Sequence, residues 1–458
     1  MMRHFFQNSK FKIRHSYRGF TLIESLVFLF LFSLISIVFL QTYSVGTRLI
    51  IESKNRLGAT ALANQKMEII RSIDYEDIGT TSGIPAGDLS EDETISVNTI
   101  RYQVHTFVQY VDDGFDGTVS TGDTIPTDYK RVRLTVSWGN LGTDQTVVIF
   151  GNFSPNGVES SAGGGVLSIN VLDASGTGVT GASVRIVNST AGVDVTGSTD
   201  STGNLMLPGA PAGTEAYTVT VSKSGYYGAT TYPAYPTSVF NPVDVHASVV
   251  ADALNQKTIV MDQSSDITLT TEDPFGTAIP NIGYTMTGGR VLGTDPGTGE
   301  DVTGFSDTAT TDASGGASYP DESYGDYVIT TSSTDYEFLK LSPGATVANE
   351  FSATAGSATD VSVIMLDKNI GSVLVRVQNQ SDATALAGAS VQLTNTLLSY
   401  DVTVVTDQYG YAYFPTSLPE LVPETYDISV SLAGYGTETA TVNVNGILET
   451  EIIGLTAN

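Results

Sequence analysis

The chain has 458 residues, 49 acidic and 21 basic side chains, a formal net charge of −28 and no cysteine. A chain without cysteine has no disulfides, thiol nucleophiles or thiolate metal sites. After residue 71 the charge imbalance grows, because 46 of the acids but only 11 of the basic residues lie there. Such an acidic surface repels phosphate backbones and anionic lipid, so nucleic acid is not expected as a partner.

The N-terminal segment joins a basic stretch to a long apolar run. Residues 1–19 hold five basic side chains and no acid, whereas residues 20–40 hold one charge, Glu24. In a helix, the apolar run is about 30 Å long, which is enough to cross a bilayer core. The preceding basic residues predict an N-terminus that stays in the cytoplasm. Because a carboxylate inside such a span is costly, Glu24 is expected to have a partner.

The stretch GFTLIE at residues 19–24 resembles the class III leader of type IV pilins and type II secretion pseudopilins. The resemblance implies that a prepilin peptidase cuts after Gly19 and that Phe20 becomes the N-methylated N-terminus. It also implies that Glu24 pairs with the terminal amine of a neighbouring subunit. The apolar run would be a membrane anchor first and part of the filament core later. An uncleaved anchor, with Glu24 reaching the membrane interface, is the alternative.

One helix is predicted over residues 20–72, because no proline precedes Pro85 and apolar residues recur at helical spacing. The first half of this helix is apolar on all sides. The second half is amphipathic and should lie on a globular head. Gly46 and Gly58 weaken the helix and are candidate bends. The recurring apolar residues of the second half are Val45, Leu49, Leu57, Leu62, Ile69 and Ile70.

A turn-rich segment, 74–93, ends the helix, and alternating strands follow within the region 94–153. The predicted strands cover residues 94–98, 102–111, 131–138 and 146–153. A helix followed by a small antiparallel sheet is the pilin layout, and LANQKMEIIRSIDYEDIG and DYKRVRLTVSW look like segments of minor pilins. We therefore predict a pilin-like domain over residues 20–153. Residues 154–165, with a glycine run, have the composition of a linker.

The remaining sequence repeats itself. A ThrAsp-x-x-Gly motif precedes an apolar strand three times, and each copy is followed by a strand that begins with tyrosine. Three correlated motifs in one order predict three repeated domains, at residues 166–262, 263–367 and 368–458. The middle copy differs, with PNIGYTM where the others have GASVRI or GASVQL, and with a predicted long loop at 287–304. The motifs begin at Thr199, Thr311 and Thr406, and the strands at Tyr217, Tyr327 and Tyr426.

Short alternating strands with frequent turn signals indicate β-sandwiches. The spacing resembles the carboxypeptidase regulatory-like, transthyretin-like domain. The predicted fold class is therefore an α+β pilin module followed by all-β, immunoglobulin-like or transthyretin-like sandwiches. In each motif, the aspartate is expected to bond backbone amides and the glycine to take positive φ, so that both residues build a turn.

Residues suited to catalysis are scarce, and no enzyme activity is predicted. Only His105 and His246 occur after the leader, and neither has a spaced partner in the sequence that would indicate a ligand or a base. A satisfied or exposed histidine is therefore the preferred interpretation of both. The GxGxxG pattern at residues 176–181 precedes a strand, whereas a dinucleotide site needs a helix there. That pattern is therefore interpreted as a turn.

One acidic loop has spacing similar to a calcium site. Asp112, Asp116 and Asp123 take the first, fifth and twelfth positions of an EF-hand-like loop, but glycine occupies the third position and no helix flanks it. A solvated hairpin is the preferred interpretation, calcium is the alternative, and no other cofactor is expected. A weaker acidic set in the middle repeat is Asp295, Glu300 and Asp301.

An aromatic and proline-rich stretch could form a stacking surface for sugar, although packing on its own sandwich is the preferred interpretation. Its aromatic residues are Tyr226, Tyr227, Tyr232, Tyr235 and Phe240.

Together these features predict a minor type IV pilin-like subunit. The precursor would cross the inner membrane once, and the processed chain would join an extracellular filament with other pilin subunits. Its partners would be the prepilin peptidase, the assembly machinery and an unknown surface ligand of the sandwiches. The alternatives are a pseudopilin of a secretion system and a membrane-anchored module that binds carbohydrate or protein.

Overall fold

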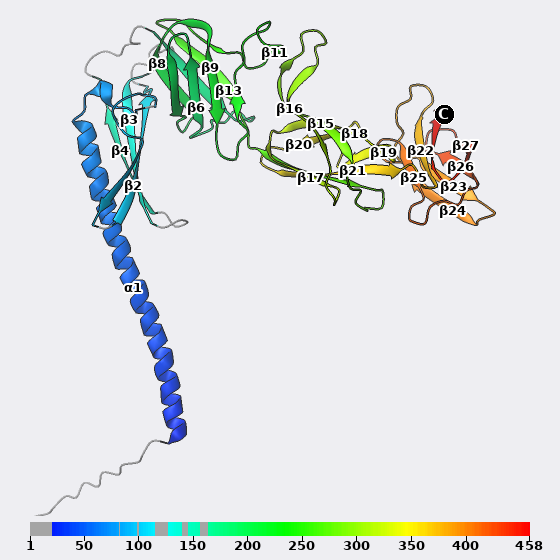
Figure 1. Ribbon diagram of the computed structural model, residues 1–458, viewed down its shortest axis with the longest axis horizontal. Helices are drawn as coiled ribbons and strands as arrows, with labels where there is room; N and C mark the ends of the chain where they lie inside the picture. The colour runs from blue at the N-terminus through cyan, green and yellow to red at the C-terminus, as the bar shows by residue number, and fades with distance from the viewer. Residues whose placement is uncertain (1–20, 82, 99, 115–126, 140–144, 156–163) are drawn as a thin grey trace, which may run out of the picture. The chain divides into compact units, whose positions relative to one another are not determined.

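The computed structural model describes residues 21–81, 83–98, 100–114, 127–139, 145–155 and 164–458. One long N-terminal helix precedes a series of mainly antiparallel sheets that form sandwiches, which confirms the predicted fold class (Figure 1). The chain divides into two compact units. The first comprises residues 1–74, 90–107 and 132–151, and the second comprises residues 75–89, 108–131 and 152–458.

Helix α1 (Leu22–Arg71) begins at an N-cap, and residues 21–24 have the sequence pattern of a capping box. Thr21 is its N-cap, and the Thr21 side chain accepts a hydrogen bond of 3.2 Å from the backbone amide of Glu24. At the other end, the backbone amide of Ser72 donates to the Ile69 carbonyl. The local sequence therefore supplies both a start and a stop for a helix of 50 residues.

Only the C-terminal turns of α1 are buried within the first unit. The buried residues follow helical spacing and are Ala59, Leu62, Ala63, Met67 and Ile70. The predicted apolar stripe was wrong at Val45, Leu49, Leu57 and Ile69, which are all exposed. Apolar spacing alone could not distinguish turns that pack on the sheet from turns that extend beyond it.

A four-stranded sheet in the order β1-β2-β3-β4 packs against these turns. The Tyr102 hydroxyl donates to the Asn55 carbonyl at 3.0 Å, and Lys66 forms an ion pair of 2.7 Å with Glu93. Inward and outward residues alternate along β2 and β3, as expected of strands with one covered face. The strands are β1 (Asp92–Val97), β2 (Ile100–Val111), β3 (Tyr129–Trp138) and β4 (Gln145–Phe153).

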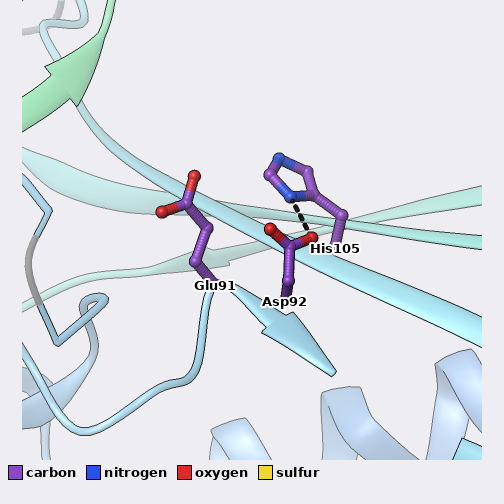
Figure 2. A group of neighbouring side chains, drawn as sticks. All are labelled: Glu91, Asp92 and His105. Atoms are coloured by element: carbon purple, nitrogen blue, oxygen red, sulfur yellow. Dashed lines mark hydrogen bonds and ion pairs between the residues drawn. The ribbon is translucent and has the colours of Figure 1, made fainter. Parts of the chain in front are cut away.

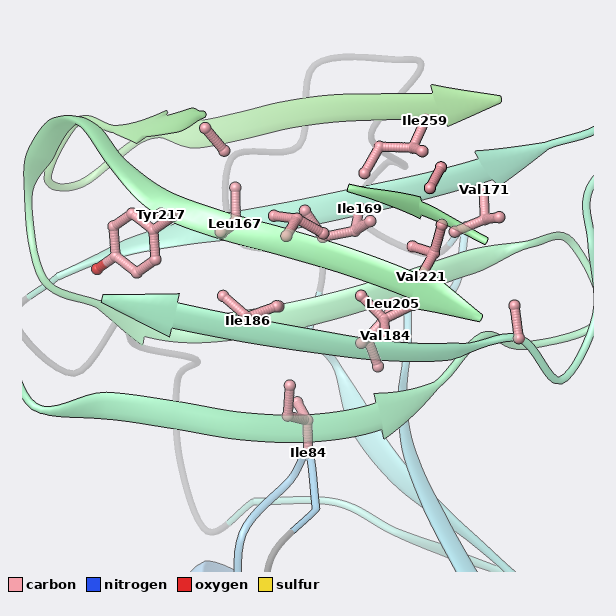
Figure 3. Close-up of a cluster of buried hydrophobic side chains, with 14 of the residues drawn as sticks. Ile84, Leu167, Ile169, Val171, Val184, Ile186, Leu205, Tyr217, Val221 and Ile259 are labelled. Atoms are coloured by element: carbon pink, nitrogen blue, oxygen red, sulfur yellow. The ribbon is translucent and has the colours of Figure 1, made fainter. Parts of the chain in front are cut away.

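The first sandwich has a sheet β13-β5-β8 and a second sheet β10-β9-β6-β7, with β12 paired to β9. Its core also contains Ile84, which comes from the segment after α1 and is only 5% exposed (Figure 3). The strands are β5 (Gly165–Leu172), β6 (Ser183–Asn188), β7 (Val193–Ser198), β8 (Asn204–Ala210), β9 (Gly213–Ser222), β10 (Ala229–Thr230), β12 (Ala247–Val249) and β13 (Leu254–Val260).

The second sandwich has sheets β17-β14-β21-β19 and β11-β15-β18-β20, with β16 paired to β15. The long loop predicted at 287–304 was wrong, because most of it forms the β15–β16 hairpin. Register shifts around Val291 let this glycine-containing segment continue as paired strands. The strands are β11 (Asn241–Pro242), β14 (Ser265–Glu272), β15 (Gly283–Thr294), β16 (Asp301–Thr310), β17 (Gly316–Glu322), β18 (Gly325–Ser332), β19 (Tyr336–Ser342), β20 (Glu350–Ala353) and β21 (Ala358–Asp367).

The third sandwich has sheets β25-β22-β28 and β24-β23-β26-β27. In all three sandwiches the first strand pairs in parallel with the last, as β5 with β13, β14 with β21 and β22 with β28. The strands are β22 (Ser372–Asn379), β23 (Ser390–Asn395), β24 (Tyr400–Val405), β25 (Tyr411–Phe414), β26 (Thr425–Ser431), β27 (Glu438–Asn443) and β28 (Leu448–Leu455).

The turn roles predicted for the repeated motif are confirmed. In the third copy, Asp407 Oδ1 accepts from the backbone amides of Tyr409 and Tyr411, and Gly410 has φ 78°. The other copies form the same turn through Asp200 and Asp312, with Gly203 at φ 81° and Gly315 at φ 77°.

The motif threonine has a role that was not predicted from the sequence. Thr406 is 4% exposed, accepts a hydrogen bond from the Ala389 amide at 2.9 Å and donates to the Leu386 carbonyl at 2.7 Å. Thr199 bonds in the same way to Ala182 and Val179. These hydroxyls satisfy buried backbone groups that the strands leave unpaired.

The repeated tyrosines have a second shared role. Tyr327 is fully buried and its hydroxyl donates to the Ser323 carbonyl at 2.7 Å. Tyr426 donates to the Val422 carbonyl at 3.0 Å, and Tyr217 donates to a backbone carbonyl upstream in the same manner. A buried ring with its hydroxyl returned to the preceding backbone is the arrangement of a tyrosine corner.

Candidate functional site

Helix α1 presents a long apolar surface. Every large apolar residue from Leu22 to Leu40 is at least half exposed, and exposed apolar residues continue to Ile51. By length and composition α1 is the only helix in the described part of the chain that could span a membrane, and none of its most apolar segment is buried. This surface is too large and continuous for a water-facing helix, so it is the first candidate interface.

Glu24 lies in the first turn of α1, at the start of this apolar surface. Its side chain is exposed, and no basic side chain within the described residues forms an ion pair with it. The partial positive charge at a helix N-terminus favours a carboxylate there. Gly19 and Phe20, the predicted processing residues, lie outside the described residues.

A second candidate site lies on the edge of the first unit's sheet, where Glu91, Asp92 and His105 come together (Figure 2). The His105 Nδ1 atom is 3.0 Å from Asp92 Oδ1. The expectation of a satisfied or exposed histidine fits His105, but its partner was not identified from the sequence: β1 and β2 pair with Asp92 directly opposite His105. The missed signal was hairpin register: residues equidistant from the connection between two adjacent strands face one another.

His246 is held by neighbouring hydroxyl groups. Its Nδ1 atom is 2.9 Å from the Thr231 hydroxyl, and Nε2 is 3.4 Å from the Thr218 hydroxyl. Burial lowers the pKa of the His246 imidazole below its usual range. These contacts confirm the interpretation of His246 as a structural residue satisfied within its own domain.

The acidic candidates do not form a complete calcium site among the described residues. Asp112 lies directly after β2, whereas Asp116 and Asp123 lie outside the described residues. In the middle repeat, Asp295 Oδ1 accepts from the backbone amides of Gly297 and Thr298. These bonds lower the pKa of the Asp295 carboxyl, and they assign Asp295 to the turn between β15 and β16.

The other two acids of that set are also placed by the hairpin. Asp301 is the first residue of β16 and pairs with Thr294 of β15. The Glu300 carbonyl accepts a hydrogen bond from the Asp295 amide. Asp295, Glu300 and Asp301 are therefore all explained by the turn and strands of this hairpin.

The predicted aromatic surface is mostly packed rather than open. Tyr232 meets Phe240 edge to face at 5.3 Å, and Phe240 is 9% exposed. Tyr226 packs on the core of the first sandwich, while Tyr235 is the exposed member. Tyr227 and Tyr232 also line a cavity of about 370 Å³ that contains Asp244 and Arg290.

Asp244 forms ion pairs with two basic side chains beside this cavity. Arg290 lies 2.8 Å from Asp244, and Lys257 lies 3.3 Å from the other carboxylate oxygen. All three side chains are less than a fifth exposed. The Asp244 carboxylate is already shared by two cations. Its first role is therefore to hold together β13, which carries Lys257, and β15, which carries Arg290.

Comparison with known proteins identifies one part of the chain. Residues 166–262 match the family described as Carboxypeptidase regulatory-like domain, which agrees with the resemblance seen in the repeats. No curated protein matches the chain.

Several solved structures are similar to parts of the chain, at low identity. The Bacillus anthracis TIE protein has 13% identity and a TM-score of 0.20, and the match covers 80% of this chain and 73% of that one. A Streptococcal ancillary pilin has 11% identity and a TM-score of 0.17, with 64% and 98% covered. The shaft pilin SpaA from Lactobacillus rhamnosus GG has 11% identity and a TM-score of 0.16, with 43% and 98% covered. At TM-scores of this size, neither a shared overall fold nor a shared function follows.

Proposed function

We propose that this chain is a minor subunit of a type IV pilin-like filament and that it displays three β-sandwiches at the cell surface. The observation that carries the proposal is the surface of α1, which is apolar and exposed from Leu22 to Ile51 and has Glu24 at its start. In water this surface is unfavourable, at roughly 25 cal/mol for each Å² left exposed. A bilayer before assembly and the helices of other subunits after assembly would both cover it.

The proposed pathway starts with a precursor anchored in the inner membrane by α1. A prepilin peptidase cuts after Gly19, and Phe20 becomes the methylated N-terminus. The Glu24 carboxylate then accepts the terminal amine of a neighbouring subunit. In an apolar filament core an unpaired charge is strongly unfavourable, so this pairing would set the axial register of the subunits. The sandwiches would bind a surface ligand and perform no catalysis.

The position of the subunit is also part of the proposal. The residues after 164 form an appendage far larger than the four-stranded sheet that packs on α1. Such an appendage on every subunit would crowd a dense filament. A rare or tip position therefore fits better than that of the main structural subunit.

The decisive experiment combines intact-mass and N-terminal analysis of the chain recovered from the cell surface with a charge-neutral variant, Glu24→Gln. We expect a chain that starts at methylated Phe20, and loss of the variant from filaments while the precursor stays in the membrane. Glu68→Gln is the matched control. It makes the same change on the same helix, in an exposed pair with Arg71 that contributes little.

Other results would favour the rival functions. A chain that still carries Met1 would contradict processing, and unchanged surface display of Glu24→Gln would indicate a simple membrane-anchored binding module. Processing together with association only with a secretion complex would indicate a pseudopilin.

A further inference from the structure

Glu91, Asp92 and His105 are brought to one side of the sheet by two different features. Asp92 and His105 face one another across β1 and β2. Glu91 lies in a bend immediately before β1, where its carbonyl still accepts a 2.7 Å hydrogen bond from the Thr106 amide. The bend lets two consecutive acidic side chains approach the same imidazole, as Figure 2 shows. Along a regular strand they would point to opposite faces.

The spacing of these groups suits a metal ion. One ligand atom from each residue can be chosen so that all three atoms lie within 4.8 Å of one another. A tetrahedral ion with bonds of about 2.0–2.2 Å separates its ligand atoms by about 3.3–3.6 Å. The set therefore needs only small side-chain adjustments. Among the described residues it is the only group of three such side chains that meets this spacing.

The three side chains are open to solvent, and β1, which carries Asp92, is held on its opposite face by a contact with α1. His105 and Asp92 are 38% and 77% exposed, so an ion can reach them without opening the fold. The next residue of β1, Glu93, points to the other face and is held there by Lys66 from α1. The backbone that carries Asp92 is consequently fixed on both sides, by β2 and by the helix contact.

We propose that Glu91, Asp92 and His105 bind a divalent transition-metal ion, with Zn²⁺ as the best match. One imidazole nitrogen and two carboxylate oxygens are a ligand set of Zn²⁺, Mn²⁺ and Co²⁺, whereas Ca²⁺ prefers oxygen alone. The two carboxylates balance the charge of the ion, and water completes its coordination. The ion would tie the start of the edge strand β1 to β2, so it would stabilise the first unit by mass action. This proposal is independent of filament assembly.

The test is a calorimetric titration of the detergent-solubilised full chain with Zn²⁺ alone, and with Ca²⁺ alone as a comparison. To keep histidines of the leader out of the signal, the result is scored as the difference between the wild type and matched variants. We expect the wild type to bind one more equivalent of Zn²⁺ than His105→Ala, and Asp92→Asn to weaken that binding at least tenfold. Glu68→Gln is the control, because it changes an exposed acid of the same unit that lies outside the site.

A second measurement guards against misfolded variants. The unfolding temperature of each protein is recorded with and without Zn²⁺. We expect Zn²⁺ to raise that of the wild type and of Glu68→Gln, to raise that of Asp92→Asn less, and to leave that of His105→Ala unchanged. Equal Zn²⁺ binding by the wild type and His105→Ala, both of them folded without metal, would overturn the proposal. Binding of Ca²⁺ in preference to Zn²⁺ would also overturn it.

Discussion

The Tyr102 hydroxyl sits directly beside Gly58 of α1, where a β-carbon added to the glycine would lie 2.5 Å from that oxygen. Tyr102 is only 1% exposed, packs edge to face on Trp138 and donates its proton to the Asn55 carbonyl. It therefore has little room to retreat. The only other glycine of α1, Gly46, has no atom within 4 Å of such a β-carbon.

This difference predicts opposite effects for the same substitution on one helix. Gly46→Ala should stabilise α1 by about 1 kcal/mol, the usual difference in helix propensity. Gly58→Ala should instead destabilise the contact between α1 and the sheet despite the same gain in propensity. Thermal unfolding of the detergent-solubilised full chain measures both. The double variant Gly58→Ala/Tyr102→Phe removes the obstructing oxygen, so a failure to recover stability would refute this explanation.

Ile84 predicts a long-range effect on the first sandwich. Its side chain lies in that core although the residue precedes β5 by about 80 positions. Ile84→Ala leaves a cavity and should reduce the free energy of unfolding of that sandwich by about 2–5 kcal/mol. Chemical denaturation followed by hydrogen exchange at β5 and β13 measures the loss. Ile69→Ala, at a half-exposed site on α1, is the control and should leave β5 protected.

The buried Thr406 hydroxyl predicts a clear difference between two small substitutions. Thr406→Val keeps the shape but leaves the Ala389 amide and the Leu386 carbonyl without their partner, at a cost of about 1–3 kcal/mol. Thr406→Ser keeps the hydroxyl and should cost less. The free energies of unfolding from urea titrations decide this comparison. If Thr406→Val cost little and Thr406→Ser cost more, the methyl contact rather than the hydrogen bonds would matter.

The buried tyrosines predict a loss of stability in alkaline solution. Burial raises the pKa of Tyr327 to about 12, whereas an unfolded phenol titrates near 10. Because the folded pKa is the higher one, this stabilisation is complete below pH 10 and is lost as the pH rises from 10 to 12. For Tyr327 the loss is at most about 3 kcal/mol. Unfolding free energies at several pH values, with phenolate absorbance recorded in parallel, measure it.

The control for this pH dependence is Tyr327→Phe, which should flatten the decline above pH 10. Lys130 has the opposite effect on stability. Burial lowers its pKa, so the folded state favours the neutral amine and gains stability as the pH rises. The difference between wild type and variant is therefore decisive. An identical decline in both would contradict the role of Tyr327.

The sequence was sufficient for features that depend on local chemistry. The capped apolar run predicts α1, and Asp407 with Gly410 predicts a turn because such turns need only a carboxylate and a residue at positive φ. Features that depend on contacts between distant segments could not be read in the same way. The position of Ile84 in a remote core and the pairing of His105 with Asp92 are of this second kind.

The parallel pairing of the first and last strands has a mechanical consequence. In the first sandwich the chain enters through β5 and leaves through β13, and these strands are joined by seven parallel register pairs. Because the strands run in the same direction, a pull on the two ends draws them past each other along their length. The load falls on all seven pairs at once, as shear, instead of opening them one by one. The same arrangement holds for β14 with β21 and for β22 with β28, so each sandwich is built as a link that resists tension.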